Sequence, residues 1–278
     1  MGPYHPALEE PYKLDMICEG ETVIDEMCIR DRLSLADELP ALVLGLIISI
    51  VDMAAFAEFA IGVQLIPSAT TPPLLLGAAA TTSLVAALLM LTQRSLKRLL
   101  VLSTIEDVGF LLLGIASISI VGIKGAMIAA ATHALAKALL FICLSAPEAD
   151  GVLNAESTGL ITRYPVSAFG FLFGMLAMLG IPPTLGFIGR WRLYETAVQI
   201  GWPLAAVFIL SSILALIAYV LALTRIWWGP SHAPSPPAST SPRSEPLVLQ
   251  AVIVTLVALL LVGGIWPSTL QLLHWGQL

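Results

Sequence analysis

The chain has 278 residues, of which 58% are hydrophobic and only 12% are charged, and its mean hydropathy is +0.91. A soluble domain carries about 25% charged residues because its surface must face water. The composition therefore excludes a soluble globular domain, a disordered chain, a collagen, a coiled coil and a free nucleic-acid-binding protein. It predicts an all-α, multi-pass membrane protein whose first partner is the lipid bilayer.

The net charge of −6 arises almost entirely in the first 38 residues. Residues 1–38 hold ten acids and three bases, a net of −7, whereas residues 39–278 hold nine acids and ten bases, a net of +1. This acidic leader has no apolar run long enough for a signal peptide. Residues 27–32 read MCIRDR, which the end of a common transposase library adaptor encodes. We expect residues upstream of about Leu33 to be a non-native junction; a natural acidic leader is the alternative.

Apolar runs predict seven membrane spans, since a bilayer core needs about 20 apolar residues per helix. The predicted spans are 39–66, 73–91, 99–120, 125–146, 166–197 (broken), 203–227 and 247–266. Residues 229–246 are rich in proline and serine, which predicts a flexible linker. The expected organisation is a leader (1–38), a membrane domain (39–228), this linker (229–246), and a final helix with its tail (247–278).

Basic residues predict the orientation of the spans. Most of them fall on the side of the predicted N-terminus, and Lys124 alone falls clearly on the other; the first group is Arg94, Lys97, Arg98, Arg163, Arg225 and Arg243. Cytoplasmic loops carry an excess of Lys and Arg. We therefore expect the N-terminus in the cytoplasm and the C-terminus outside, in the inner (cytoplasmic) membrane of the cell.

Ionisable residues inside the predicted spans are the candidate functional sites, because a charge in hydrocarbon is costly. They are Asp52 and Glu58 in the first span, Glu106 and Asp107 in the third, His133 and Lys137 in the fourth, and Arg190 in the fifth. The spacing of four residues puts His133 and Lys137 on one helix face. The alternatives are that the lysine extends to the interface and that the acids pair with bases on neighbouring helices.

The segment 178–189 (MLGIPPTLGFIG) predicts a break in the fifth span. Pro182 and Pro183 remove backbone donors, and glycines that include Gly186 and Gly189 loosen the helix around them. Such a break persists in a membrane only where protein or a wet cavity surrounds it. A proline loop between two ordinary spans is the alternative.

Three phrases occur in one order: QRSLKRLLVLSTIEDVGFLLLG (93–114), THALAKALLF (132–141) and LGIPPTLGFIGRW (179–191). Together they resemble the antiporter-like, proton-conducting membrane subunits of respiratory complex I, Mrp-type cation/proton antiporters and membrane-bound hydrogenases. The resemblance implies that these spans match the last seven helices of a fourteen-helix subunit, with one five-helix repeat and one helix on either side. The first repeat has no counterpart in this sequence, which implies a separate chain that supplies it or a truncated gene.

The resemblance also implies roles for individual residues. Lys137 matches the central proton-relay lysine and His133 the histidine before it, and Lys97 matches a lysine at the loop-to-helix junction. Ser95 stands where the family usually has an acid. The acid at Glu106 is similar to the residue that the hydrogenase-associated members have at this position. Arg190 takes the place of the exit-side lysine. A desolvated lysine can release its proton but a guanidinium stays charged, so we expect Arg190 to act as an electrostatic gate.

The implied function is a proton-translocating subunit of an NADH:quinone oxidoreductase-like or hydrogenase-like complex, with a relay of Lys137, His133, Glu106, Lys97 and Asp107 and with Asp52 and Glu58 as accessory acids. The implied partners are the other membrane-arm subunits. The sequence contains no flavin, iron–sulfur, quinone or metal motif, so we expect no cofactor or redox centre in this chain. Two alternatives stay open: a component of an Mrp-type antiporter, and a non-conducting scaffold or fragment of a membrane arm.

Overall fold

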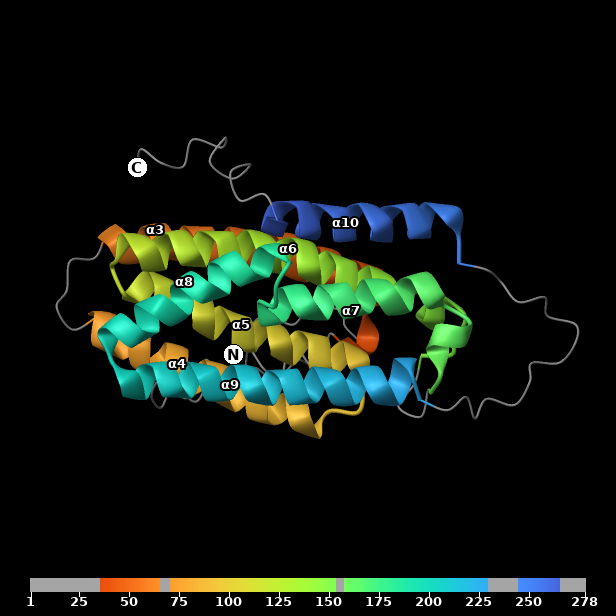
Figure 1. The fold of residues 1–278 in the computed structure, drawn as a ribbon, viewed down its shortest axis with the longest axis horizontal. Helices are drawn as coiled ribbons and strands as arrows, with labels where there is room; N and C mark the ends of the chain where they lie inside the picture. Colours follow the sequence, from red (N-terminus) through yellow and green to blue (C-terminus); the bar gives the residue numbers. More distant parts are fainter. Residues whose placement is uncertain (1–35, 66–70, 154–157, 230–244, 266–278) are drawn as a thin grey trace, which may run out of the picture.

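The computed structural model describes residues 36–65, 71–153, 158–229 and 245–265, and within these ranges the chain forms a bundle of roughly parallel helices (Figure 1). Most of the predicted leader, the greater part of the predicted linker and the tail after Ile265 lie outside the described residues. The described residues of the leader, 36–38, form one helical turn, and Ala36 is fully buried against the bundle.

The helices follow one another with short connections. In the first part of the chain they are α2 (Ala41–Leu46), η1 (Ile47–Val51), α3 (Asp52–Leu65), α4 (Thr71–Thr92), α5 (Leu96–Ala116) and α6 (Ile120–Ala149). In the second part they are η2 (Leu160–Thr162), α7 (Pro165–Leu179), α8 (Leu185–Ile200), α9 (Trp202–Ala222), η3 (Leu223–Trp227) and α10 (Leu247–Ile265). The π-helical turn η1 joins α2 and α3 into one span, and η3 extends α9 in the same way.

Six helices in the described residues are long and apolar enough to cross a bilayer, and α7 is a shorter apolar helix. The protein is therefore a multi-pass membrane protein. Six of the seven predicted spans, all except 166–197, correspond to these six helices, with ends that differ by up to several residues. The predicted broken span 166–197 is two separate helices, α7 of 15 residues and α8 of 16. They follow one another along the length of the bundle (Figure 1).

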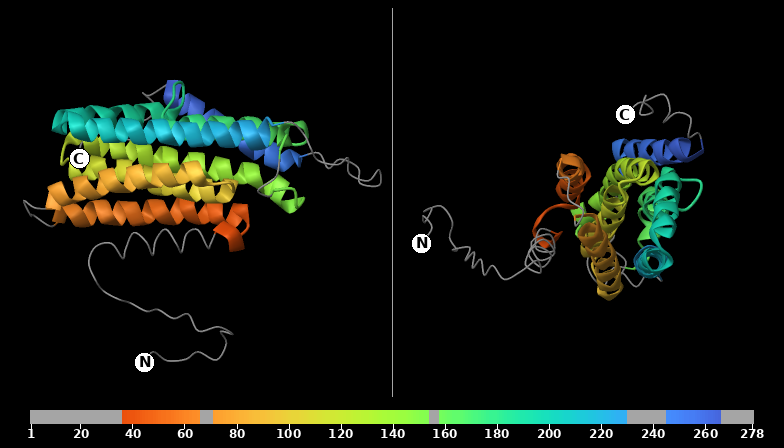
Figure 2. Two further views of the ribbon diagram at one scale, coloured as in Figure 1. Left: turned by 90° about the horizontal axis from the view of Figure 1, so that it is seen from below. Right: turned by 90° about the vertical axis from the view of Figure 1, so that its left-hand side faces the viewer.

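The most enclosed helix is α5. Buried positions make up 83% of its apolar segment, against 11% for α10. Viewed along the bundle axis, α5 and α6 lie in the middle, while α3, α9 and α10 lie on the outside (Figure 2). Helix α4 packs along α5 and α9, and α6 packs against α5, α7 and α8. A polar side chain on the inner faces of α5 or α6 is consequently shielded from both lipid and water.

The break between α7 and α8 depends on glycines. Gly180 ends α7 with φ of +68°, a left-handed conformation that glycine adopts without strain. A Cβ on Gly186 would lie 1.8 Å from the carbonyl oxygen of Ala177, and a Cβ on Gly189 would lie 2.7 Å from the backbone nitrogen of Ala129. Gly186 lets α8 start beside the end of α7, and Gly189 lets α8 pack closely on α6.

The basic residues gather at one end of the bundle. The turn between α4 and α5 carries Arg94 and is followed by Lys97, while η3 at the end of α9 carries Arg225 beside that turn. Lys97 pairs with Glu148 in the last turn of α6, which fixes that turn at the same end. Lys124, in the first turns of α6, lies at the opposite end. Arg192 of α8 lies beside Gly125 at this opposite end, and Arg243 lies outside the described residues.

Candidate functional site

Five of the predicted site residues meet in the middle of the bundle. Glu106 is the central residue of α5, Lys137 and His133 lie near the middle of α6, and Arg190 lies in the second turn of α8. All are buried: the exposed fraction is 0% for Lys137 and His133, 2% for Glu106, and 3% for Asp107 and Arg190. Charges this far from water are costly unless they are paired or hydrogen-bonded, so the contacts that surround them decide what they can do.

The first group of contacts, here called the lysine cluster, consists of Lys137, Ser103, Tyr219 and the carbonyl of Leu100. Lys137 Nζ donates to the carbonyl oxygen of Leu100 at 2.6 Å and also to Ser103 Oγ. Ser103 Oγ accepts a second hydrogen bond from the Tyr219 hydroxyl at 2.8 Å and donates to Leu100 O at 2.8 Å. Every hydrogen-bond partner of the lysine is thus a neutral oxygen.

The second group, here called the arginine cluster, consists of Arg190, Glu106, Asp107 and His133. Arg190 Nη1 and Nη2 contact the two carboxylate oxygens of Glu106 at 3.2 and 3.0 Å, and Nη2 also donates to Asp107 Oδ1 at 2.8 Å. The guanidinium lies 3.8 Å from the centre of the Phe110 ring, a cation–π distance. One permanent cation is therefore held by two carboxylates and an aromatic face.

His133 connects the arginine cluster to the face of α6 that carries Lys137. Its Nδ1 lies 2.7 Å from Asp107 Oδ2, so one carboxylate bridges the histidine and the arginine. His133 Nε2 has no hydrogen-bond partner among the described residues. His133 also lines a small cavity of about 10 Å³, enough for roughly one water molecule, together with Thr132, Ala177, Gly186 and Arg190. The cavity lies at the break between α7 and α8.

The other predicted site residues lie outside both clusters. Lys97 Nζ donates to Glu148 Oε1 at 2.7 Å and to the carbonyl of Leu39 at 2.8 Å. Glu148 also accepts from the backbone nitrogen of Ala41, so this pair ties α5, α6 and the start of α2 together at the basic end. Asp52 is half-buried at the start of α3, and Glu58 is exposed on α3.

The structure adds four hydroxyl groups that the sequence did not single out. Ser103 and Tyr219 belong to the lysine cluster, as described above. Ser212 Oγ lies 3.4 Å from Arg190 Nη1 and 2.5 Å from the hydroxyl of Tyr194. Serine and tyrosine are common in apolar helices, so the available signal was only their four-residue or seven-residue spacing on faces that proved to be internal. Across the described ranges, no group of three or more His, Cys, Asp or Glu side chains is arranged to hold a metal ion.

Residues 36–216 match the family described as the transmembrane part of NADH:quinone oxidoreductases and Mrp antiporters. The chain belongs to this family. The match covers α2 to most of α9 and therefore includes the arginine cluster and all of the lysine cluster except Tyr219. Members of this family are membrane subunits, and the buried lysine, histidine and acids of this chain lie inside the matched region.

Two relatives and one solved structure illustrate the similarity. The chain is 32% identical to NADH-quinone oxidoreductase subunit N of Moorella thermoacetica over 184 residues, which cover 65% of this chain and 37% of that protein. It is 30% identical to F(420)H(2) dehydrogenase subunit N of Methanosarcina mazei over 191 residues, 64% of this chain and 38% of that protein. A chain of an archaeal membrane-bound sulfane sulfur reductase shares the fold, with a TM-score of 0.73 and 20% identity over 87% of this chain and 50% of that one.

The chain thus spans about two fifths of the length of the curated relatives that it matches. These relatives are, by their names, subunits of larger complexes. The family and the fold are established for this chain.

Proposed function

We propose that the protein is a proton-conducting membrane subunit of a complex like the NADH:quinone oxidoreductases, with Lys137 as its central proton-exchanging group. The observation that carries the proposal is the setting of Lys137: it is fully buried in the middle of α6, and its hydrogen-bond partners are neutral oxygens only. A carboxylate partner would hold the proton on the lysine, whereas a carbonyl and a hydroxyl leave it exchangeable.

Ser103 suits both protonation states of the lysine. A lysine ammonium donates to Ser103 Oγ, and the hydroxyl proton of Ser103 then points to Leu100 O. When the ammonium has released its proton, the neutral amine has a lone pair. A rotated Ser103 hydroxyl can donate a hydrogen bond to that lone pair, since hydroxyl groups both donate and accept. Tyr219 donates to Ser103 in either case. Lys137 and Ser103 therefore stay hydrogen-bonded to each other in both states, while the hydroxyl proton of Ser103 moves from Leu100 O to the amine.

The arginine cluster provides the next position for the proton and a net charge that favours its arrival there. With both carboxylates ionised and His133 neutral, the cluster carries a net charge of −1. This excess negative charge favours the arrival of a proton at His133, one helical turn from Lys137. Arg190 keeps its own charge and does not carry the proton, because a guanidinium stays protonated in proteins. It acts as a fixed electrostatic gate beside the break that Pro182, Pro183, Gly186 and Gly189 form.

The proposal also covers the helical repeat, the orientation and the partners of the chain. Helices α4 to α9, including the α7–α8 pair, form one five-helix repeat, which α2–α3 and α10 flank. The basic end faces the cytoplasm, as the excess of Arg and Lys there favours. The partners are other membrane-arm subunits, one of which supplies the first repeat, and these partners carry the redox cofactors and the quinone chemistry. The chain itself acts as a translocase part without a redox centre.

A non-conducting scaffold is the second candidate, and Arg190 is the observation in its favour. Where the family resemblance implies a lysine, this chain has an arginine clamped by Glu106 and Asp107. A permanent cation in that position would block a path that needed every site to exchange its proton.

Proton flux through the purified full chain in liposomes tests the proposal. A potassium diffusion potential drives protons inward, and a trapped pH dye reports their arrival. Loss of a proton-transferring group typically slows a reaction about 10²- to 10⁴-fold, so Lys137→Ala should reduce the flux at least about 100-fold. The matched control is Lys124→Ala, at the end of α6, which should leave the flux within about twofold. Thermal unfolding of each variant confirms that it is folded.

The other outcomes identify the alternatives. A folded wild-type chain without proton flux, which nevertheless assembles with its partner subunits, would overturn the proposal in favour of the scaffold. Flux that requires sodium on the opposite side of the membrane would identify an antiporter component. Unchanged flux in Lys137→Ala would reject the lysine as the central site.

A further inference from the structure

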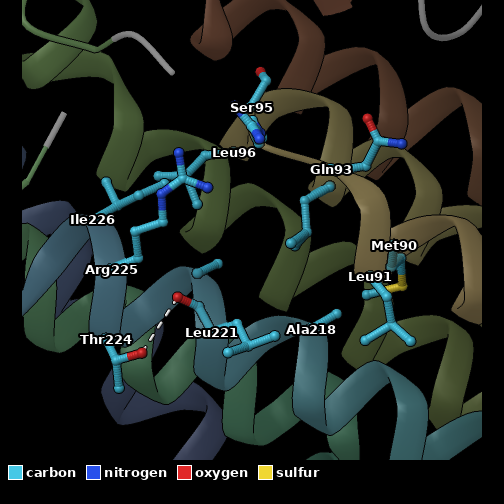
Figure 3. A pocket seen from close by; sticks show the side chains of 13 residues that line it. Met90, Leu91, Gln93, Ser95, Leu96, Ala218, Leu221, Thr224, Arg225 and Ile226 are labelled. Atoms are coloured by element: carbon cyan, nitrogen blue, oxygen red, sulfur yellow. Dashed lines mark hydrogen bonds between the residues drawn. The ribbon is translucent and has the colours of Figure 1, made fainter. Parts of the chain in front are cut away.

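A second cavity lies at the basic end of the bundle, away from both clusters. Its volume is about 230 Å³, and it opens between the turn that joins α4 to α5 and the end of α9 with η3. Figure 3 shows the side chains that line it, with Arg225 of η3 extending toward the turn that carries Gln93 and Ser95. No residue of this cavity takes part in the lysine or the arginine cluster.

The lining of the cavity is positively charged. Arg94 and Arg225 line it from its two sides, and no aspartate or glutamate is among the lining residues. Gln93, Ser95 and Thr224 add polar groups beside the two arginines. Arginine binds phosphate through paired N–H groups, so the lining matches a phosphate-bearing anion.

The start of α5 adds to this positive field. Ser95 is the N-cap residue of this 21-residue helix, and its side chain makes no capping hydrogen bond. The first N–H groups of a helix have no partner within the helix, and the aligned peptide dipoles place a partial positive charge there. Because Ser95 and Leu96 both line the cavity, this helix end favours the same anion as the two arginines.

The cavity also lies where lipid headgroups would be. α4 ends at Thr92, α5 starts at Leu96 and η3 ends at Trp227, so the cavity is at the ends of three membrane-spanning segments. Toward the middle of the membrane, α4 and α9 pack together and carry exposed apolar side chains, among them Leu88 (48% exposed), Ile217 (44%) and Leu221 (55%). Leu221 itself lines the cavity, which links the charged end to an apolar surface.

We propose that this cavity binds the headgroup of an anionic phospholipid, with its phosphate between Arg94 and Arg225 and its acyl chains along α4 and α9. Basic pockets between helices at the cytoplasmic surface are suited to anionic headgroups. The bound lipid fastens the α4–α5 turn to the end of α9, the helix that carries Tyr219. A soluble phosphate would contact the arginines but not the apolar surface, so the lipid is the better fit.

Native mass spectrometry of the purified full chain tests the proposal, with phosphatidylglycerol and phosphatidylcholine added in defined amounts. The double variant Arg94→Gln/Arg225→Gln removes both cavity cations. The control Lys124→Gln/Arg192→Gln removes the same charge near the start of α6, where the two side chains lie on neighbouring helices. At about a factor of five per basic residue, the cavity variant should bind phosphatidylglycerol about 30-fold more weakly than the wild type. The control should bind it as the wild type does.

Three results would overturn the proposal: equal retention of phosphatidylcholine, unchanged phosphatidylglycerol binding by the cavity variant, or full displacement of the lipid by inorganic phosphate at millimolar concentration. The last result would assign the cavity to a soluble anion. Thermal unfolding with and without phosphatidylglycerol gives an independent reading. Lipid bound to the folded state should raise the Tm of the wild type and of the control, but not that of the cavity variant.

Discussion

The lysine cluster and the arginine cluster lie one helical turn apart on α6, and both hold a buried cation, but with opposite chemistry. Lys137 contacts a carbonyl and a hydroxyl, whereas Arg190 contacts two carboxylates and an aromatic ring. The first setting leaves a cation that can lose its proton without breaking an ion pair. The second holds a cation in place by ion pairs that compensate its burial.

Under the proposed function, this difference combines an exchangeable charge at Lys137 and a fixed charge at Arg190 within one small volume. The fixed charge organises α5, α6 and α8 around the helix break, because Arg190, Glu106, Asp107 and His133 come from these three helices. The mobile charge then needs only hydroxyl groups from α5 and α9. The comparison predicts that variants of the arginine cluster affect folding first, and variants of the lysine cluster affect conduction first.

The largest effect on stability is expected for Arg190→Ala. The change leaves the carboxylates of Glu106 and Asp107 buried without their cation, which typically costs about 3–5 kcal/mol. Lys137→Ala leaves only neutral groups without a partner, for a cost of about 1–3 kcal/mol. Unfolding of both variants in the same detergent gives the comparison. Equal destabilisation would contradict the distinction between the two clusters.

A smaller structural effect is expected for Gly186→Ala at the helix break. The new methyl group would collide with the carbonyl of Ala177, so α8 must move away from α7, at a cost of about 1–3 kcal/mol. Gly77→Ala in α4 is the control, because no atom lies within 4 Å of the added carbon and alanine favours a helix by about 1 kcal/mol. The first variant should lower the Tm and the second should keep or raise it; a stable Gly186→Ala protein would disprove the tight break.

Two tyrosines, the buried Tyr219 and the half-buried Tyr194, are expected to separate the clusters functionally. Tyr219→Phe removes the hydrogen bond to Ser103, a change of about 0.5–1.5 kcal/mol, and should slow proton flux several-fold. Tyr194→Phe removes a comparable hydrogen bond to Ser212 beside Arg190 and should leave the flux near that of the wild type. Flux in liposomes measures both. A stronger effect of Tyr194→Phe would reverse the roles assigned to the two sides.

The smallest effect concerns the ion pair between Asp37 and Arg98, outside both clusters. The hydrogen bond from Arg98 holds the pKa of the Asp37 carboxyl below its ordinary value. The pair therefore contributes stability above the ordinary pKa of about 3.9 and loses it as the pH falls through the lower pKa of the folded state. For a pair this exposed the contribution is about 0.5 kcal/mol or less. The Tm difference between the wild type and Asp37→Asn should shrink steadily as the pH falls below about 3.9; a constant difference would contradict the assignment.

The sequence predicted the helical bundle and the members of the arginine cluster, because charges and paired prolines stand out within apolar runs. It did not predict that the buried charged residues separate into a lysine cluster and an arginine cluster. Adjacent Glu106 and Asp107 both reach Arg190, since α8 crosses close to α5 at the glycine-rich break. Ser103 and Tyr219 are 116 residues apart and carry no charge, so no local pattern linked them to Lys137. Lys97 matched the family's pattern, yet its contact is Glu148 at the basic end.

Exchanging the cations of the two clusters distinguishes a proton-exchanging site from a fixed charge. Lys137→Arg keeps a positive charge but replaces the exchangeable proton with a permanent one, and Arg190→Lys does the opposite at the fixed site. Proton flux of the two folded variants is measured in liposomes beside the wild type. We expect Lys137→Arg to lose the flux and Arg190→Lys to retain it. Flux at the wild-type rate in Lys137→Arg would contradict the account.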